Sequence, residues 1–200
     1  MFQEKSSTHV FVLRAILAAV IIILAAVVRI VPHPWNFTPI GAMALFSGAM
    51  FRDRRIAFLF PLVALFAGDL FVGLHRLIPV VYASFLLSVF IGTWLANRRG
   101  IRRIGGAVFL GALQFFLITN FAVWQLFGTY PHTPAGLAAC YIAGLPFFGN
   151  TLAGDALYAT LFFGSFALAE YLLPSLRLQP FGACRDHPDE NDVRNRLDEC

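Results

Sequence analysis

The sequence has little charge for its length. Asp, Glu, Lys and Arg make up only 13% of the 200 residues, whereas 58% are hydrophobic and Phe alone occurs 22 times. A soluble domain usually carries about 25% charged residues, because polar groups must cover its surface. The composition therefore excludes a disordered protein and an ordinary cytosolic enzyme, and it predicts a polytopic membrane protein.

Cysteine is scarce as well. The three cysteines, Cys140, Cys184 and Cys200, are odd in number and unevenly spaced, so they do not indicate a disulfide-rich secreted domain. Cys184 and His187 are close in sequence, but two residues are too few to hold a metal ion. We therefore expect no bound metal and no cofactor.

The common catalytic and nucleotide-binding motifs are missing too. The chain has no Gly-x-Ser-x-Gly, no His-Glu-x-x-His and no Gly-x-x-x-x-Gly-Lys-Ser/Thr, the signatures of many serine hydrolases, zinc proteases and P-loop ATPases. The formal net charge is +4, but the arginines are clustered between apolar runs, which is typical of membrane topology. We expect neither an enzyme nor a nucleic-acid-binding protein.

Long apolar segments are what the sequence does contain, and a membrane-spanning helix needs about 20 such residues. The first segment is long enough to span, and Arg29 disrupts the context of a signal-peptide cleavage site, so we expect an uncleaved helix rather than a signal peptide. The second segment is short; it either spans with help from its flanks or lies inside the bundle. The six segments cover residues 10–31, 40–51, 56–74, 78–96, 104–127 and 151–173.

These segments predict an all-α membrane protein, a six-helix transmembrane bundle. Its first outer loop is rich in proline, and a short helix over 135–145 lies between spans five and six, ended by a break at Pro146–Asn150. Residues 1–9 would form a cytoplasmic N-terminus and residues 10–173 the membrane domain. The charged, proline-punctuated residues 174–200 read as a flexible cytoplasmic tail.

The arginines predict the orientation of the bundle. Short cytoplasmic loops carry an excess of Lys and Arg, which places both clusters inside. Both termini are then cytoplasmic, and His75-Arg76 and 128–134 lie outside. The clusters are Arg52, Arg54 and Arg55, and Arg98, Arg99, Arg102 and Arg103.

In this orientation, polar and aromatic residues from different segments fall at the same outer depth. Ionisable residues within a membrane are costly and usually face a bundle interior or a water-filled cavity. Aromatic faces with a few hydrogen-bonding groups are what a small-molecule site requires. The candidate solute-binding residues are Trp35, Asn36, Asp69, Asn120, Trp124, Tyr130, Asn150 and Asp155.

Structural roles explain the same residues differently. The aromatic side chains are also expected in the belt at a membrane interface. Arg29 is a candidate to form a structural ion pair with Asp69 or Asp155, and Asn120 to bond a neighbouring helix. In the inner half, Arg14 and Glu170 are placed to pair with each other or to extend to the interface.

Part of the sequence resembles a known group of proteins. Pro-His-Pro-Trp-Asn-Phe-Thr-Pro at residues 32–39, Ala-Gly-Asp at 67–69, Asn-Phe-Ala-Val-Trp at 120–124 and Gly-Leu-Pro-Phe-Phe-Gly-Asn at 144–150 resemble an uncharacterised family of bacterial inner-membrane proteins. The resemblance extends over most of residues 29–160. It implies an inner-membrane location and specifies no activity.

The layout is more loosely similar to the substrate-binding (S) components of energy-coupling-factor vitamin transporters. That similarity implies a lid at 32–39, an outward-facing ligand pocket, and an energising coupling subunit with ATPases that docks on small residues of the first helix. The corresponding small residues here are Ala15 and Ala19. No motif specific for binders of thiamine, riboflavin, biotin, folate or cobalamin is present, so the ligand stays open.

The sequence thus favours an uptake component that binds a vitamin-like small molecule. A ligand-free structural or assembly protein is the first alternative. An intramembrane enzyme is less favoured, because the serines and histidines are predicted at different depths and have no catalytic motif around them.

Overall fold

The structure is a computed structural model that describes residues 12–23, 36–51, 53–73, 75–96 and 99–173. Within these ranges every regular element is a helix, which confirms the predicted all-α class. An N-terminal helix, Val12–Ile23, precedes five others in chain order. These are α2 (Ile40–Met50), α3 (Arg54–Val72), α4 (Ile78–Thr93), α5 (Ile101–Leu126) and α6 (Pro134–Leu172).

Two of the described helices are long and apolar enough to cross a membrane. They are α5 with 26 residues and α6 with 39, whereas the apolar N-terminal helix, α2 and α4 are shorter. The outer faces of α5 and α6 expose large apolar side chains such as Phe109, Leu117, Leu161 and Leu168. Helices with such faces indicate association with a membrane, as the composition does.

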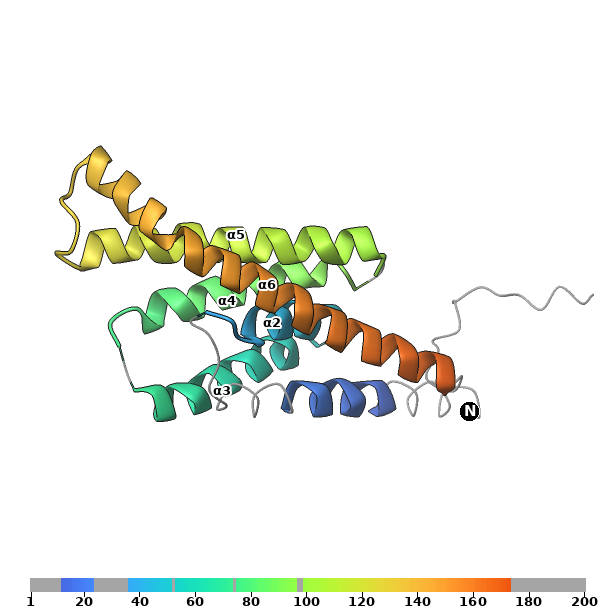
Figure 1. Cartoon of the computed structure of the whole chain (residues 1–200). Coiled ribbons are helices and arrows are strands. Elements are labelled where there is room, and N and C mark those ends of the chain that lie inside the picture. Colours follow the sequence, from blue (N-terminus) through green and yellow to red (C-terminus); the bar gives the residue numbers. More distant parts are fainter. Residues whose placement is uncertain (1–11, 24–35, 52, 74, 97–98, 174–200) are drawn as a thin grey trace, which may run out of the picture.

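The short helix α2 lies inside the bundle. All its residues from Ile40 to Ala49 are buried, and it contacts α3, α4, α5 and α6. Figure 1 shows it in the middle of the molecule, enclosed by the longer helices. Of the two alternatives that the sequence left open for this segment, the structure adopts the one inside the bundle. A helix surrounded in this way can be apolar on every face.

Glycines let α2 and α4 approach each other closely. Gly48 of α2 lies directly against the carbonyl of Val89 in α4, and Gly92 of α4 lies directly against the carbonyl of Leu45 in α2. A Cβ atom at either glycine would overlap with the backbone of the other helix. The two helices therefore pack backbone to backbone, as small residues allow at helix contacts in membranes.

Aromatic packing joins α2 to α6. The ring of Phe46 lies 5.9, 5.2 and 5.9 Å, between ring centroids, from those of Phe162, Phe163 and Phe166. Such tilted and edge-to-face pairs stabilise a core beyond the area that they bury. On its other side α2 is bonded to α3, because the Ser47 hydroxyl donates a hydrogen bond to the carbonyl of Ala57 at 2.7 Å.

The helix ends form two groups at opposite ends of the bundle. The α3–α4 and α5–α6 connections lie at one end, and the α4–α5 connection lies towards the other, where α6 also ends (Figure 1). We call these the turn end and the arginine end. His75–Leu77 forms the expected tight turn between α3 and α4. The structure thus separates the connections that the sequence assigned to different sides of a membrane.

The predicted break before span six is wrong. Helix α6 runs without interruption from Pro134 to Leu172 and contains Pro146. A proline removes one backbone hydrogen bond from a helix interior, and packing on both sides offsets that loss. Before it, Gly144 lies against Asn120; after it, the ring of Phe148 packs on α5 at 5.2 Å from that of Phe116.

The contact between α2 and α4 can be tested with one added methyl group. We expect Gly48→Ala to lower the free energy of unfolding by about 1–3 kcal/mol, because overpacking a tight contact forces the backbones apart. Thermal unfolding of the detergent-solubilised protein measures the change. Gly105→Ala on α5 is the matched control, since nothing lies within 4 Å of a Cβ there, and it should leave stability unchanged or raise it slightly. Equal unfolding temperatures for the two variants would disprove the tight contact.

Candidate functional site

A buried carboxylate on α6 bonds the beginning of α2. The backbone N–H of Ala42 donates to Asp155 Oδ1 at 2.9 Å, and Asp155 is 2% exposed. Pro39, the residue that precedes the helix, provides no side-chain cap. The first N–H groups of a helix lack partners within it and attract negative charge. Asp155 therefore serves as a cap supplied from another helix.

Two glycines make room for this contact. Gly41 faces the carboxylate so closely that a Cβ atom there would overlap with both carboxylate oxygens of Asp155. Gly154 faces the chain that leads into α2, and a Cβ on it would lie 3.3 Å from Phe37 Cα and Thr38 N. Residues 154–155 of α6 thus hold both the start of α2 and the segment before it.

The chain turns sharply just before this contact. Asn36 is exposed and has a φ of 61°, a left-handed conformation that asparagine tolerates better than most residues. Phe37 follows, with its ring 6.1 Å from that of Tyr158 on α6. The other predicted residue of this loop, Trp35, lies outside the described residues, and so does the rest of the expected lid before it.

Asp69 is the second buried carboxylate among the predicted residues. It lies near the end of α3 and is 2% exposed. The proposed ion pair between Arg29 and Asp69 is not tested, because Arg29 lies outside the part of the chain that the structure describes. Burial of a carboxylate within an apolar helix is costly, so Asp69 needs partners inside the bundle.

Three predicted residues lie at the turn end, where α5 joins α6. Asn120 Nδ2 donates to the carbonyl of Phe116 at 2.9 Å, and Trp124 Nε1 donates to the carbonyl of Pro131 at 2.9 Å. The ring of His132 stands edge-on to that of Trp124, with 5.2 Å between centroids. Tyr130 is half-buried in the same connection. The contacts of Trp124 with Pro131 and His132 hold the α5–α6 connection together, whereas the Asn120 bond lies within α5 and does not reach a neighbouring helix as expected.

The structure therefore divides the predicted cluster in two. Asn120 lies against Gly144, whereas Asp155 lies farther along α6 against the start of α2. At 1.5 Å per residue, the distance along α6 from Gly144 to Asp155 is roughly 16 Å. Asn150 is half-buried between these two positions. A solute that contacts both groups would have to lie along this part of α6.

Sequence reasoning missed several contacts around these residues. The Tyr141 hydroxyl donates to the carbonyl of Leu117 at 2.8 Å, and the Cys140 thiol to that of Asn120 at 3.4 Å. Gln114 Nε2 on α5 donates to the Ser84 carbonyl and the Ser88 hydroxyl on α4, both at 3.0 Å. A glutamine inside an apolar segment was the available signal, since such a group needs partners.

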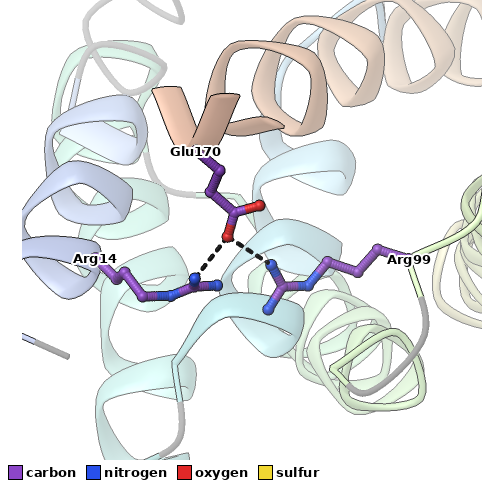
Figure 2. Close-up of polar contacts among 3 residues, drawn as sticks. All are labelled: Arg14, Arg99 and Glu170. Carbon is purple, nitrogen blue, oxygen red and sulfur yellow. Dashed lines mark ion pairs between the residues drawn. The ribbon is translucent and has the colours of Figure 1, made fainter. Parts of the chain in front are cut away.

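A charged cluster occupies the arginine end. Arg14 Nη1 lies 2.6 Å from Glu170 Oε1, which confirms the expected pair, and Arg99 Nη1 lies 3.7 Å from the same oxygen. Figure 2 shows the Glu170 carboxylate between the two guanidinium groups. Both guanidinium carbons also lie near the ring of Phe166, at 5.2 and 5.8 Å from its centroid. Burial, then the charge of Arg14, lower the pKa of Arg99, and Glu170 opposes them.

The N-terminal helix carries the small residues predicted to dock a partner. Ala15 is exposed, and Ala19 is half-buried and packs against the hydrophobic core.

Within the described ranges, no group of three or more His, Cys, Asp or Glu is placed to hold a metal ion.

The capping role of Asp155 gives a direct test. We expect Asp155→Ala to lower the free energy of unfolding by about 1–3 kcal/mol, because it leaves the buried N–H of Ala42 without its acceptor. Asp155→Asn should stay near wild type, since it keeps an acceptor oxygen. Thermal unfolding in detergent measures both variants. Thr160→Ala is the control, because that exposed hydroxyl bonds only within its own helix at 2.8 Å. If Asp155→Ala has the same unfolding temperature as the control, Asp155 is not the cap.

Comparison with known proteins places the chain in a family. No curated protein and no solved structure matches it. A family model described as a family of unknown function (DUF6580) matches residues 10–176, a range that contains every described helix. The prediction of an uncharacterised family is thereby confirmed. The chain belongs to the DUF6580 family.

Proposed function

We propose that this chain is a multi-pass protein of the bacterial cytoplasmic membrane that binds a small, vitamin-like solute from outside and acts in its uptake. The observation that carries the proposal is the burial of two carboxylates, Asp69 and Asp155, each 2% exposed, on separate apolar helices. Ionisable residues inside a membrane bundle usually mark a substrate or ion pathway. These two lie on the helices that enclose α2.

The arrangement of the other predicted residues supports the same proposal. Asn120, Trp124 and Tyr130 lie at the turn end, and Asn36 begins the chain that Asp155 and Gly154 hold against α6. Aromatic faces and amide groups from several helices would stack on a heterocyclic solute and orient it. Trp35 and the rest of 32–39 would close over the solute as a lid and exclude water.

An energised partner is part of the proposal. The chain has no P-loop motif, so active uptake would need a coupling subunit with ATPases, as in the transporters whose S components it loosely resembles. The exposed face of the N-terminal helix around Ala15 would dock that subunit, because small residues allow close helix approach.

A ligand-free structural protein is the second candidate, and one observation favours it. Asp155 and Trp124 already form hydrogen bonds to other parts of the chain, and these bonds alone account for their presence at helix contacts. The two candidates differ in whether a small molecule stabilises the folded protein.

The proposed topology predicts the outcome of reporter fusions. A fusion at Asn97, between α4 and α5, should report the cytoplasm, and one at His132, between α5 and α6, should report the outside. The reason is the excess of arginine near residue 97 and the position of the two connections towards opposite ends of the bundle (Figure 1). An outside signal at Asn97 would reverse the orientation and place the proposed solute site in the cytoplasm.

Solute binding is tested with whatever molecule co-purifies with the detergent-solubilised protein, identified by mass spectrometry after denaturation. Added back at 100 times its Kd, that molecule should stabilise the folded state by about 2.7 kcal/mol. Trp35→Ala and Asn36→Gly should weaken its binding at least tenfold while the unfolding temperature without solute stays unchanged. Glycine is chosen at position 36 because it tolerates the positive φ there.

The matched control is Trp94→Ala at the arginine end, where the tryptophan is 64% exposed. It removes a similar side chain far from the proposed site and should bind the solute as wild type does. Equal binding by all three variants would eliminate the lid. The absence of any stabilising small molecule would favour the structural protein.

A further inference from the structure

We propose that the arginine end binds the phosphate headgroup of an anionic phospholipid through Arg99, Arg102 and Arg103. The inference rests on the proposed membrane location and concerns a different part of the molecule from the solute site. The surface consists of Arg99, Gly100 and the first turn of α5, and Arg99 reaches Glu170 near the end of α6.

The sequence leaves this surface with an excess of positive charge. No Asp or Glu occurs between Asp69 and Asp155, so neither α4 nor α5 carries an acidic residue. The arginines at positions 98, 99, 102 and 103 therefore have no acidic neighbour on their own elements. Any negative charge that balances them must come from another part of the chain or from outside it.

Among the described residues, Glu170 of α6 is the acidic residue that reaches this surface, and Arg14 has the closer contact with it. The separations are 2.6 Å for Arg14 and 3.7 Å for Arg99, and the second is longer than a hydrogen bond. The Nε atom of Arg99 is also buried without a hydrogen-bond partner in the described part of the chain. Glu170 thus neutralises Arg99 incompletely.

The first turn of α5 favours an anion for a second reason. Arg102 and Arg103 are exposed there, and Gly100, the residue before the helix, provides no side-chain cap. Cations at a helix N-terminus oppose the helix dipole, whereas a phosphate there is favourable and bonds N–H groups that lack partners within the helix. An anion at this position would relieve both the charge repulsion and the missing cap.

The neighbouring side chains indicate that the anion is a lipid headgroup. Trp94 is 64% exposed and Ile101 is 87% exposed, so an aromatic and an aliphatic side chain flank the arginines on the surface. Tryptophan collects at membrane–water interfaces, and basic groups at the cytoplasmic side attract anionic lipids. A lipid offers a charged headgroup to the arginines and acyl chains to these two side chains.

The test is native mass spectrometry of the full chain in detergent, titrated with phosphatidylglycerol or phosphatidylcholine. Wild type should bind phosphatidylglycerol more tightly, and added salt should reduce the difference. Arg99→Gln should weaken phosphatidylglycerol binding about fivefold, and Arg102→Gln with Arg103→Gln about 25-fold, given the effect of one basic residue near a charged membrane surface. Binding of phosphatidylcholine should not change.

Arg76→Gln is the control, because it removes one exposed arginine at the opposite end of the bundle. The double variant changes only exposed side chains, so it keeps the test valid if Arg99→Gln fails to fold. Equal lipid affinities for the double variant, Arg76→Gln and wild type would overturn the proposal. So would displacement of the lipid by millimolar inorganic phosphate, which would identify a free-phosphate site, or by polyglutamate, which would identify an acidic partner. None of these measurements requires the solute, so a failed solute test leaves this inference standing.

Discussion

The hydrogen bond between Asp155 and the Ala42 N–H is the constraint on which the rest of the fold depends. A helix enclosed on all sides cannot bond its first N–H groups to water, and leaving one buried without a partner costs about 1–3 kcal/mol. Asp155 provides the acceptor, so α6 has to pass the start of α2 at residue 155. Gly41 permits that approach. Once α6 is held there, its phenylalanines meet Phe46, and α2 is in register with the helices around it.

Most of the helices could be predicted from the sequence. Apolar runs separated by arginines and prolines show where each helix begins and ends, and this needs no information about packing. Expected and observed bounds of α2 to α5 differ by at most three residues at either end. The prediction of a helix break failed at Pro146, where the tendency of proline to interrupt a helix competes with packing against α5. Gly144 against Asn120 and Phe148 against Phe116 keep the helix continuous, and both contacts join residues that are far apart in the chain. No local pattern contains that information.

The depth of a side chain was predictable at one end of the bundle and not at the other. Counting residues from a helix end gives the level of a side chain, so Arg14 and Glu170 could be assigned to one level and do form a pair. The face that a side chain presents depends on helix rotation and tilt. Asn120 and Asp155 were assigned to one depth but lie at separate places along α6, because α6 begins at Pro134 and not at residue 151 as expected. Gly41 was not predicted because its role depends on a carboxylate from another helix.

In the proposed function, α6 is the element that would link solute binding to the rest of the bundle. Asp155 and Glu170 lie on one helix, roughly 22 Å apart at 1.5 Å per residue, and each is bonded to a different helix. A solute that drew Asp155 away from Ala42 would uncap α2, and α2 cannot shift alone, because its backbone touches α4 at Gly48 and Gly92. Packed interiors switch between arrangements rather than deforming gradually. To switch the bundle, the solute would therefore have to bind one arrangement of α2, α4 and α6 more tightly than another. The difference in binding free energy would have to offset the loss of the Asp155–Ala42 hydrogen bond.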